Sequence, residues 1–505
     1  MSEAARSAPE TKRVEVLVVG AGFAGIGAAM ALRRAGVDDV LVIERAASLG
    51  GTWRDNTYPG VACDVPSHLY GFAAHPNPDW SHVYARGAEI RGYLEGVASR
   101  EGIRPVFGTA MLGAEWDAGT ETWHVRTGGV RLDAIEADVL VLACGRLTEP
   151  AIPELPGLES FPGPIFHSSR WDHTAELAGL RVGVVGTGAS AIQLAPTLAE
   201  TADVTLFQRT PAWIVPRDDR AYSAAERAAF AADPLLLEEV RDDLYLEGEA
   251  RHASRSGDLR AAAEARAVAL AHLAAQVPDP ELRRVLTPDY AFGCKRVLLS
   301  DDFYPAVSSG RIRLEASALA SVHGRTLVAA SGARHDVDAL VLATGFASTQ
   351  QPYATLVTGE STTLAAHWDR GMTAYASTVV SGFPNLFVLD GPNAALGHNS
   401  SVLMLEEQAA YLARTVTGRD GVLRLDPAAE ASWTADIDRA AASTPWISGG
   451  CRNWYVDDRS GRLTLLWPGT VDAFRQHLRG SDGSEFLSPV KGRGAELVSY
   501  EEKGT

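Results

Sequence analysis

The stretch VEVLVVGAGFAG, residues 14–25, decides the fold of this chain. An apolar run leads into Gly20, Gly22 and Gly25, which have the Gly-x-Gly-x-x-Gly spacing of a dinucleotide-binding βαβ unit. Glycines let the backbone turn sharply and approach a pyrophosphate at the N-terminus of the next helix. The following strand, VLVIE, ends in Glu44. Because a carboxylate there accepts hydrogen bonds from a free ribose 2′-hydroxyl and repels a 2′-phosphate, the unit is predicted to bind FAD or NAD.

The same arrangement recurs at RVGVVGTGASA, residues 181–191. Gly186 and Gly188 take the first two glycine positions, and alanine takes the third, where only close helix–strand packing is required. The strand VTLFQR then ends in Arg209. A guanidinium binds a 2′-phosphate through charge-assisted hydrogen bonds, so this unit is predicted to bind NADP. Two such units predict an α/β fold with two Rossmann-like dinucleotide-binding domains.

The order of these motifs predicts a discontinuous FAD-binding domain. Residues 1–13 are polar and alanine-rich, and we expect a disordered tail there. Residues 14–150 would form the first part of the FAD-binding domain, and residues 151–330 the NADP-binding domain. Residues 331–505 would form the second part of the FAD-binding domain and a C-terminal segment. Residues 221–286 are rich in Ala, Glu, Arg and Leu at helical spacing, which predicts a helical insertion in the NADP-binding domain, either a lid or a set of packing helices.

Composition excludes several classes of protein. The chain has 505 residues, enough for about three domains, and a net charge of −17 without a long basic run. Nucleic-acid binding is not expected, because phosphate contacts need clustered Lys and Arg. The apolar residues 14–32 include Glu15 and a glycine turn, so we expect a buried strand and helix there and no membrane span. The oligomeric state is left open.

The cysteines are Cys63, Cys144, Cys294 and Cys451, and none belongs to a Cys-x-x-Cys pair. Their wide spacing predicts no disulfide framework, no local dithiol and no cysteine-ligated zinc. We expect no metal site of another kind. A reducing, cytoplasmic compartment fits these expectations.

Two longer patterns resemble a known family. The segment FPGPIFHSSRWD, residues 161–172, fits FxGxxxHxxxW(P/D), and GGTWRDNTYPGVACD, residues 50–64, fits a second pattern of that family. With both glycine motifs and ATG at residues 343–345, the chain resembles the type I Baeyer–Villiger monooxygenases, which are class B flavoprotein monooxygenases. The resemblance implies that FAD and NADPH are used to insert one atom of O2 next to a ketone carbonyl. A C4a-peroxyflavin would be the oxygenating species, and an ester or lactone the product.

The resemblance also implies two catalytic residues. Arg296, in the segment GCKRVLLSDD, matches the family's arginine, and Asp64 matches the carboxylate that pairs with it. A permanent cation keeps a peroxide anionic and stabilises the negative oxygen of its ketone adduct. We therefore expect the pair to lie where the oxygen transfer takes place.

Cofactor contacts follow from the motifs and the resemblance together. The residues expected at FAD are Gly20, Gly22, Phe23, Gly25, Glu44, Gly51, Thr52, Trp53, Asp64 and Tyr70. The residues expected at NADP are Thr187, Gly188, Ala189, Ser190, Gln193, Arg209, Thr210, Lys295 and Arg296. The helix that opens near Ser400 should direct its positive N-terminus at the pyrimidine edge of the flavin. Trp454 resembles the tryptophan of a mobile C-terminal loop, and His167 is expected to join the two units and not to act as a base.

Two other functions share much of this pattern. A flavin monooxygenase that oxygenates nitrogen or sulfur would have the same fold and cofactors, but the Trp171-Asp172 ending and Arg296 argue against it. An NADPH–flavin oxidoreductase without oxygen insertion would also reduce FAD, but the fingerprint and the lack of a Cys-x-x-Cys pair argue against that. The ketone itself is left open.

Overall fold

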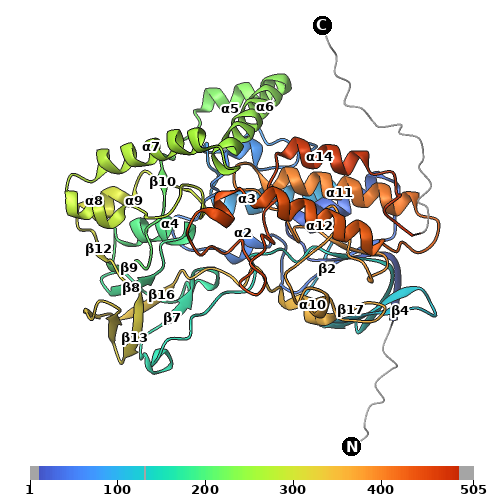
Figure 1. The fold of residues 1–505 in the computed structure, drawn as a ribbon, viewed down its shortest axis with the longest axis horizontal. Coiled ribbons are helices and arrows are strands. Elements are labelled where there is room, and N and C mark those ends of the chain that lie inside the picture. The colour runs from blue at the N-terminus through green and yellow to red at the C-terminus, as the bar shows by residue number, and fades with distance from the viewer. Residues whose placement is uncertain (1–10, 130–131, 488–505) are drawn as a thin grey trace, which may run out of the picture.

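The computed structural model describes residues 11–129 and 132–487. Two sheets that consist mainly of parallel strands lie side by side, and helices cover the upper face of the molecule in Figure 1. The predicted α/β fold with two Rossmann-like units is confirmed. Within the described ranges, every helix is too short or too polar to cross a lipid bilayer.

The first sheet has the strand order β17-β4-β5-β6-β1-β2-β3, and β18 also pairs with β6. Its strands are β1 (Thr11–Val19), β2 (Val40–Glu44), β3 (Val106–Phe107), β4 (Ala110–Asp117), β5 (Thr122–Gly128), β6 (Ala134–Leu142), β17 (Val357–Thr358) and β18 (Leu386–Val388). Two of these strands come from the late part of the chain, after the second glycine motif. The early and late segments therefore share one sheet.

The expected tail over residues 1–13 is partly wrong. Residues 1–10 lie outside the described residues, but Thr11 already belongs to β1 and pairs with Ala134 of β6. The strand begins there because β6 is long enough to provide a parallel partner over its whole length.

The core of the first unit lies between β1 and the helices above it. Helix α1 (Phe23–Arg34) follows the first glycine motif, and helix α11 (Ser401–Gly418) packs beside it. The turn between β1 and α1 is tight: a Cβ atom on Gly25 would lie 1.9 Å from the carbonyl oxygen of Gly20. Only glycine allows this approach, so the motif places the N-terminus of α1 directly at the carboxyl end of β1.

The second sheet has the order β12-β9-β8-β16-β7. Its strands are β7 (Ile165–His167), β8 (Arg181–Val185), β9 (Asp203–Phe207), β12 (Ile312–Glu315) and β16 (Ala339–Leu342). Helix α4 (Ala189–Leu198) follows the second glycine motif. Because β16 pairs with both β7 and β8, this sheet extends beyond the boundary at residue 330 that the sequence suggested.

Helices occupy the segment over residues 221–286. They are α5 (Ala224–Ala232), α6 (Pro234–Ala250), α7 (Leu259–Gln276) and α8 (Pro280–Leu286). Each begins at a side-chain cap, and Asp233 and Asp279 are followed by proline in the first turn. Helix α6 lies against the first unit, where Arg241 donates to the carbonyl oxygens of His68 and Gly71. The segment therefore bridges the two units.

The remaining elements connect and cover the sheets. They are α2 (Thr52–Asp55), α3 (Gly87–Arg100), α9 (Phe303–Ser308), α10 (Leu364–His367), α12 (Pro427–Ala441), α13 (Pro445–Ser448), α14 (Val471–Gly480), β10 (Ile214–Val215), β11 (Leu298–Leu299), β13 (Leu319–His323), β14 (Thr326–Ala329) and β15 (Arg334–Asp336). Helix α14 packs against α11 and completes the helical layer over the first sheet.

Candidate active site between the two sheets

Both helices that open the dinucleotide units begin without a side-chain cap. Gly22 and Gly188 are the N-cap residues of α1 and α4, and neither helix start receives a side-chain hydrogen bond from the described residues. The four helices over residues 221–286 all have such caps. Free N–H groups in the first turn, together with the positive end of the helix dipole, suit a phosphate group. The two helix starts therefore fit the pyrophosphates of two dinucleotides.

Glu44 lies beside the first glycine turn at the carboxyl end of β2. Its Oε2 accepts a hydrogen bond from Ala21 N at 2.9 Å, and its Oε1 pairs with Arg54 Nη1 at 3.0 Å. The carboxylate is buried, and these two partners hold it in one orientation. A carboxylate fixed at this point can bind the ribose of FAD, as the sequence predicts.

Three aromatic side chains form a wall beside the same turn. Trp53 Nε1 donates to the hydroxyl of Tyr70 at 3.2 Å, and their rings meet edge to face. Phe23 packs against Tyr70 with a centroid separation of 5.1 Å. Gly51 lies next to this wall, where it approaches the backbone of Gly22 closely and has a φ of +52°. Both features favour glycine, because it has no side chain to block the approach. Thr52 follows it as the first residue of α2.

Asp64 and Arg296 meet although they belong to different units. Arg296 Nε donates to Asp64 Oδ2 at 2.7 Å, and both side chains remain about a quarter exposed, at 29% and 27%. The carboxylate raises the pKa of Arg296 far above its usual range. Burial acts to raise the pKa of Asp64, but the charge and hydrogen bond of Arg296 outweigh it and lower that pKa. Both groups are therefore charged at any physiological pH.

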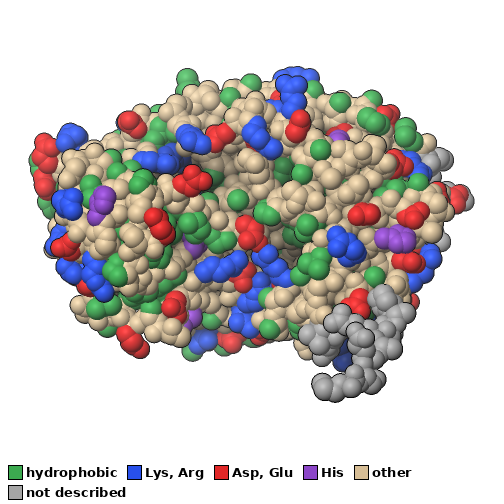
Figure 2. All heavy atoms as spheres, turned by 90° about the horizontal axis from the view of Figure 1, so that it is seen from below, with side chains coloured by type: hydrophobic (Ala, Val, Ile, Leu, Met, Phe, Trp, Pro, Cys, Tyr) green, Lys and Arg blue, Asp and Glu red, His purple; other side chains and the backbone are tan. Residues whose placement is uncertain are grey.

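Two cations lie near the end of the second unit. Burial and the charge of Arg209 lower the pKa of Lys295. Neither residue forms an ion pair with a carboxylate in the part of the chain that the structure describes. Thr187 Oγ1 donates to the carbonyl oxygen of Thr210 at 2.8 Å, which joins the glycine turn to the segment after β9. The ammonium of Lys295 lies 5.0 Å from the ring centroid of Tyr290. Two neighbouring cations that pair with no carboxylate of the described residues suit a 2′-phosphate. Figure 2 shows that basic side chains gather near the middle of one face of the molecule, despite its net charge of −17.

Gln193 has other partners than the predicted NADP contact. Its Nε2 donates to the carbonyl oxygen of Ala62 at 3.0 Å, and its Oε1 accepts from the hydroxyl of Tyr58 at 3.1 Å. These bonds tie α4 of the second unit to the loop before Asp64. The neighbouring residues of α4, Ala189 and Ser190, form its first turn at the glycine motif. A direct contact of Gln193 with NADP stays a prediction.

His167 is buried at the end of β7 in the second unit, and its expected role of joining the two units stays a prediction. Its Nδ1 accepts a hydrogen bond from Ser169 N at 3.1 Å, and its ring meets Phe346 edge to face. Burial lowers the pKa of His167 to about 4, so the imidazole is neutral near pH 7. Trp171 packs edge to face against Phe166.

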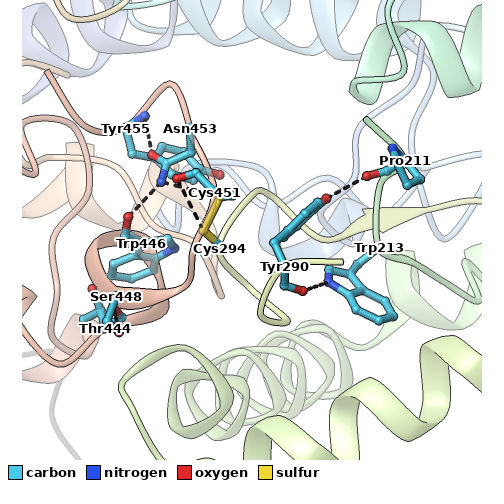
Figure 3. Close-up of a disulfide and its surroundings, with 10 residues drawn as sticks. All are labelled: Pro211, Trp213, Tyr290, Cys294, Thr444, Trp446, Ser448, Cys451, Asn453 and Tyr455. Atoms are coloured by element: carbon cyan, nitrogen blue, oxygen red, sulfur yellow. Dashed lines mark hydrogen bonds between the residues drawn. A yellow bond between two sulfur atoms is a disulfide. The ribbon is translucent and has the colours of Figure 1, made fainter. Parts of the chain in front are cut away.

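The cysteine spacing predicts no disulfide framework, but the structure contains one disulfide that this prediction did not include. Cys294 and Cys451 are bonded across 157 residues (Figure 3). Cys63 and Cys144 are free. Sequence spacing gives no signal for such a bridge, because only the packing of the C-terminal segment against the second unit brings the two sulfurs together. The bridge stands next to Lys295 and Arg296 in the sequence.

The C-terminal segment reaches the site through Tyr455, which sequence reasoning missed. Asn453 Oδ1 accepts from Tyr455 N, and Asn453 Nδ2 donates to the carbonyl oxygen of Trp446 (Figure 3). Burial raises the pKa of Tyr455, and the charge of Arg296 opposes this shift. The adjacent Trp454 accepts a hydrogen bond at its carbonyl from Ser348. The sequence singles out Trp454, but it is the neighbouring Tyr455 on which the charge of Arg296 acts, and the Tyr455 hydroxyl has no hydrogen-bond partner among the described residues.

Two more charged residues at the site were missed, Arg146 and Asp390, which form an ion pair. Each follows the carboxyl end of a strand of the first sheet. A sequence signal does exist for Arg146, because it comes directly after the buried strand ADVLVLACG. A charged residue at the carboxyl end of a buried parallel strand is typical of a binding site.

Comparisons with known proteins agree with this geometry. A family model described as pyridine nucleotide-disulphide oxidoreductase matches residues 17–227. The chain is 45% identical over 491 residues to a Baeyer–Villiger monooxygenase of Streptomyces coelicolor, and the match covers 94% of this chain and 92% of that protein.

Solved structures share the whole fold. Cyclohexanone monooxygenase from Rhodococcus sp. Phi1 bound to NADP+ matches with a TM-score of 0.83 and 28% identity, over 93% of this chain and 97% of that chain. The OTEMO complex with FAD and NADP matches with a TM-score of 0.81 and 25% identity, over 94% and 98% of the two chains. The family assignment rests on the two glycine turns that fit phosphate groups, on the paired arginine between the two units, and on relatives that match nearly the full length of the chain. This chain belongs to the Baeyer–Villiger monooxygenase family.

Proposed function

We propose that this protein is an FAD- and NADPH-dependent Baeyer–Villiger monooxygenase, which inserts one oxygen atom of O2 next to a ketone carbonyl and releases an ester or lactone. The observation that carries this proposal is the pair of Arg296 and Asp64, 2.7 Å apart and partly exposed between two dinucleotide units. A carrier of electrons alone would not need a cation held at that place.

Arg296 would stabilise the negative oxygen that forms when the ketone carbonyl is attacked. Asp64 accepts from Nε, and among the described residues no hydrogen bond is formed by the two terminal nitrogens of the guanidinium, which can face other groups. Since the pKa of Arg296 is raised, its charge does not change with pH in the working range. The bound cofactors would supply a hydride from NADPH and the flavin that activates O2.

We assign the cofactor contacts on the same basis. The uncapped start of α1, Glu44 and the aromatic wall of Phe23, Trp53 and Tyr70 would hold FAD. The uncapped start of α4, with Arg209 and Lys295, would hold NADP and prefer it to NAD. Arg296 and Asp64 would stand at the border of both sites.

The test uses the purified yellow holoenzyme with NADPH and a panel of cyclic, linear and aromatic ketones. We expect an ester or lactone that carries one labelled atom from ¹⁸O2, identified by mass spectrometry. An enzyme that oxidises amines or sulfides in the same assay but no ketone would be a nitrogen- or sulfur-oxygenating monooxygenase. NADPH consumption that yields only hydrogen peroxide with every ketone would contradict the proposal.

We further propose a small diffusible ketone and O2 as partners, and a cytoplasmic location, because NADPH is regenerated inside cells. The disulfide between Cys294 and Cys451 is unusual for a reducing compartment, so the location needs its own test. Alkylation of the protein in intact cells would show whether the two thiols are free there.

A further inference from the structure

Arg146 and Asp390 form a largely enclosed ion pair at the sheet edge of the first unit. Strands β6 and β18 run parallel with Leu142 opposite Val388, and the two charged residues follow these strand ends. Arg146 Nη1 pairs with Asp390 Oδ1, and only 13% and 17% of the two side chains are exposed. The pair therefore lies at the same carboxyl edge as the first glycine turn, where ligands of such sheets bind.

Arg146 is also held by the start of α11. Its Nη2 donates to Ser401 Oγ at 3.1 Å, in the first turn of that helix. Gln351 fixes the backbone of Arg146 by donating to its carbonyl oxygen at 3.2 Å. The guanidinium and the positive end of the helix dipole therefore act at one place, with the same sign.

This place faces the candidate active site. Tyr70, Arg296 and Tyr455 lie near enough for their charges to act on Arg146. Burial lowers the pKa of Arg146 to about 10, and the guanidinium still keeps its charge near pH 7. Its Nε finds no hydrogen-bond partner among the described residues. Arg146 and Arg296 are therefore two neighbouring cations, and each is paired with a carboxylate, Asp390 and Asp64 respectively.

Asp390 is the carboxylate that pairs with Arg146. It occupies a left-handed backbone conformation with a φ of +57°, which is uncommon for a residue other than glycine. Gln408 Oε1 accepts from its backbone N–H at 3.2 Å and helps to hold the turn. The chain thus keeps a carboxylate at an unfavourable backbone position to pair with a buried arginine.

We propose that Arg146 is a second cationic residue of the active site, which stabilises the negative charge of the reduced flavin, and that Asp390 sets how strongly it does so. This inference rests on the proposed function, in which Tyr70 belongs to the wall that would hold FAD, and on the expectation that the start of α11 faces the flavin. Hydride transfer from NADPH moves one hydrogen and two electrons to FAD, forms NADP+, takes up no proton and leaves one negative charge on the flavin. A cation beside that charge favours the reduced form and raises the midpoint potential.

The experiment is a redox titration of the flavin in the holoenzyme against a reference dye. We expect Arg146→Gln to shift the equilibrium about tenfold toward oxidised flavin, which equals about 30 mV for a two-electron couple. We expect Asp390→Asn to shift it in the opposite direction, and Arg146→Lys to stay near the wild type. Arg284→Gln, which breaks an exposed pair with Glu281, is the matched control and should not move the potential.

Opposite shifts distinguish an electrostatic role from a structural one, because general damage to the site would move both variants in the same direction. Equal potentials in all variants, or shifts of the same sign for Arg146→Gln and Asp390→Asn, would overturn the inference. If Arg146→Gln does not retain FAD, the rise in flavin midpoint potential expected for Asp390→Asn still tests the inference. Unchanged potentials in an enzyme that makes esters would refute this inference alone, whereas a flavoprotein that makes no ester from any ketone would refute the proposed function.

Discussion

Arg296 Nε donates a hydrogen bond to Asp64 Oδ2 although 232 residues separate them in the chain. Asp64 follows α2 of the first unit, and Arg296 precedes β11 beside the second sheet. The position of the cation therefore depends on how the two nucleotide units meet. Gln193 supports the same contact, because its side chain bonds to Ala62 and Tyr58 in the loop before Asp64.

Replacing the arginine should separate the two halves of the reaction. In Arg296→Ala, we expect flavin reduction by NADPH to stay within a few-fold of the wild-type rate, because Arg209 and Lys295 remain. Ester formation should fall by about 10²–10³-fold or more, as it does when one donor to a developing oxyanion is removed. Anaerobic stopped-flow absorbance measures the first step, and product mass spectrometry the second. Near-normal ester production in this variant would show that Arg296 has no catalytic role.

Arg209 should determine the choice of coenzyme. A charge-assisted contact with phosphate is worth about 1.5–3 kcal/mol, so Arg209→Ala should raise the KM for NADPH roughly ten- to hundredfold. The KM for NADH should change little, because NADH has no 2′-phosphate. Steady-state kinetics with both coenzymes measure the ratio, and Arg209→Lys is the control that keeps the charge. An unchanged NADPH/NADH preference would mean that the phosphate binds elsewhere.

The bridge between Cys294 and Cys451 should stabilise the C-terminal segment. Removing a native disulfide costs about 2–5 kcal/mol, because the cross-link restricts the unfolded chain. Cys451→Ser should therefore lower the thermal midpoint, while Cys144→Ser, at a free and partly buried cysteine, should change it less. Alkylation of the unfolded protein without reductant should label only Cys63 and Cys144. Labelling of all four cysteines would show that the bridge does not form.

The buried imidazole of His167 should make the fold sensitive to acid. Burial lowers its pKa from 6.5 to about 4, so the unfolded chain binds a proton below about pH 6.5 that the folded chain does not bind until about pH 4. The free energy of unfolding should therefore fall as the pH falls through this window, by about 1.4 kcal/mol per pH unit from this group. His167→Gln should lack this loss, which urea unfolding at several pH values would measure. Parallel pH profiles for the two proteins would refute the assignment.

Much of the fold was predictable because its signals are local. Glycines at this spacing after a strand indicate a tight turn, as at Gly20, Gly25 and Gly186. The charged residue, Glu44 or Arg209, then follows at a fixed distance along the chain. Arg296 and Asp64 carry no local signal, and only the family patterns identified them. The strand after residue 330 and the first residues of β1 were placed differently by the structure, because strand pairing depends on distant partners.

The sequence by itself determined that this chain has two dinucleotide units with opposite preference for a 2′-phosphate, since backbone turns and strand-end charges are set within about thirty residues. Only the tertiary structure decided which charges meet in the space between the units. Arg146 and Asp390 are 244 positions apart in the chain, but they follow strands that are adjacent in the sheet, and Cys294 meets Cys451 across 157 residues. Such contacts depend on packing over the whole fold, so no window of the sequence can specify them.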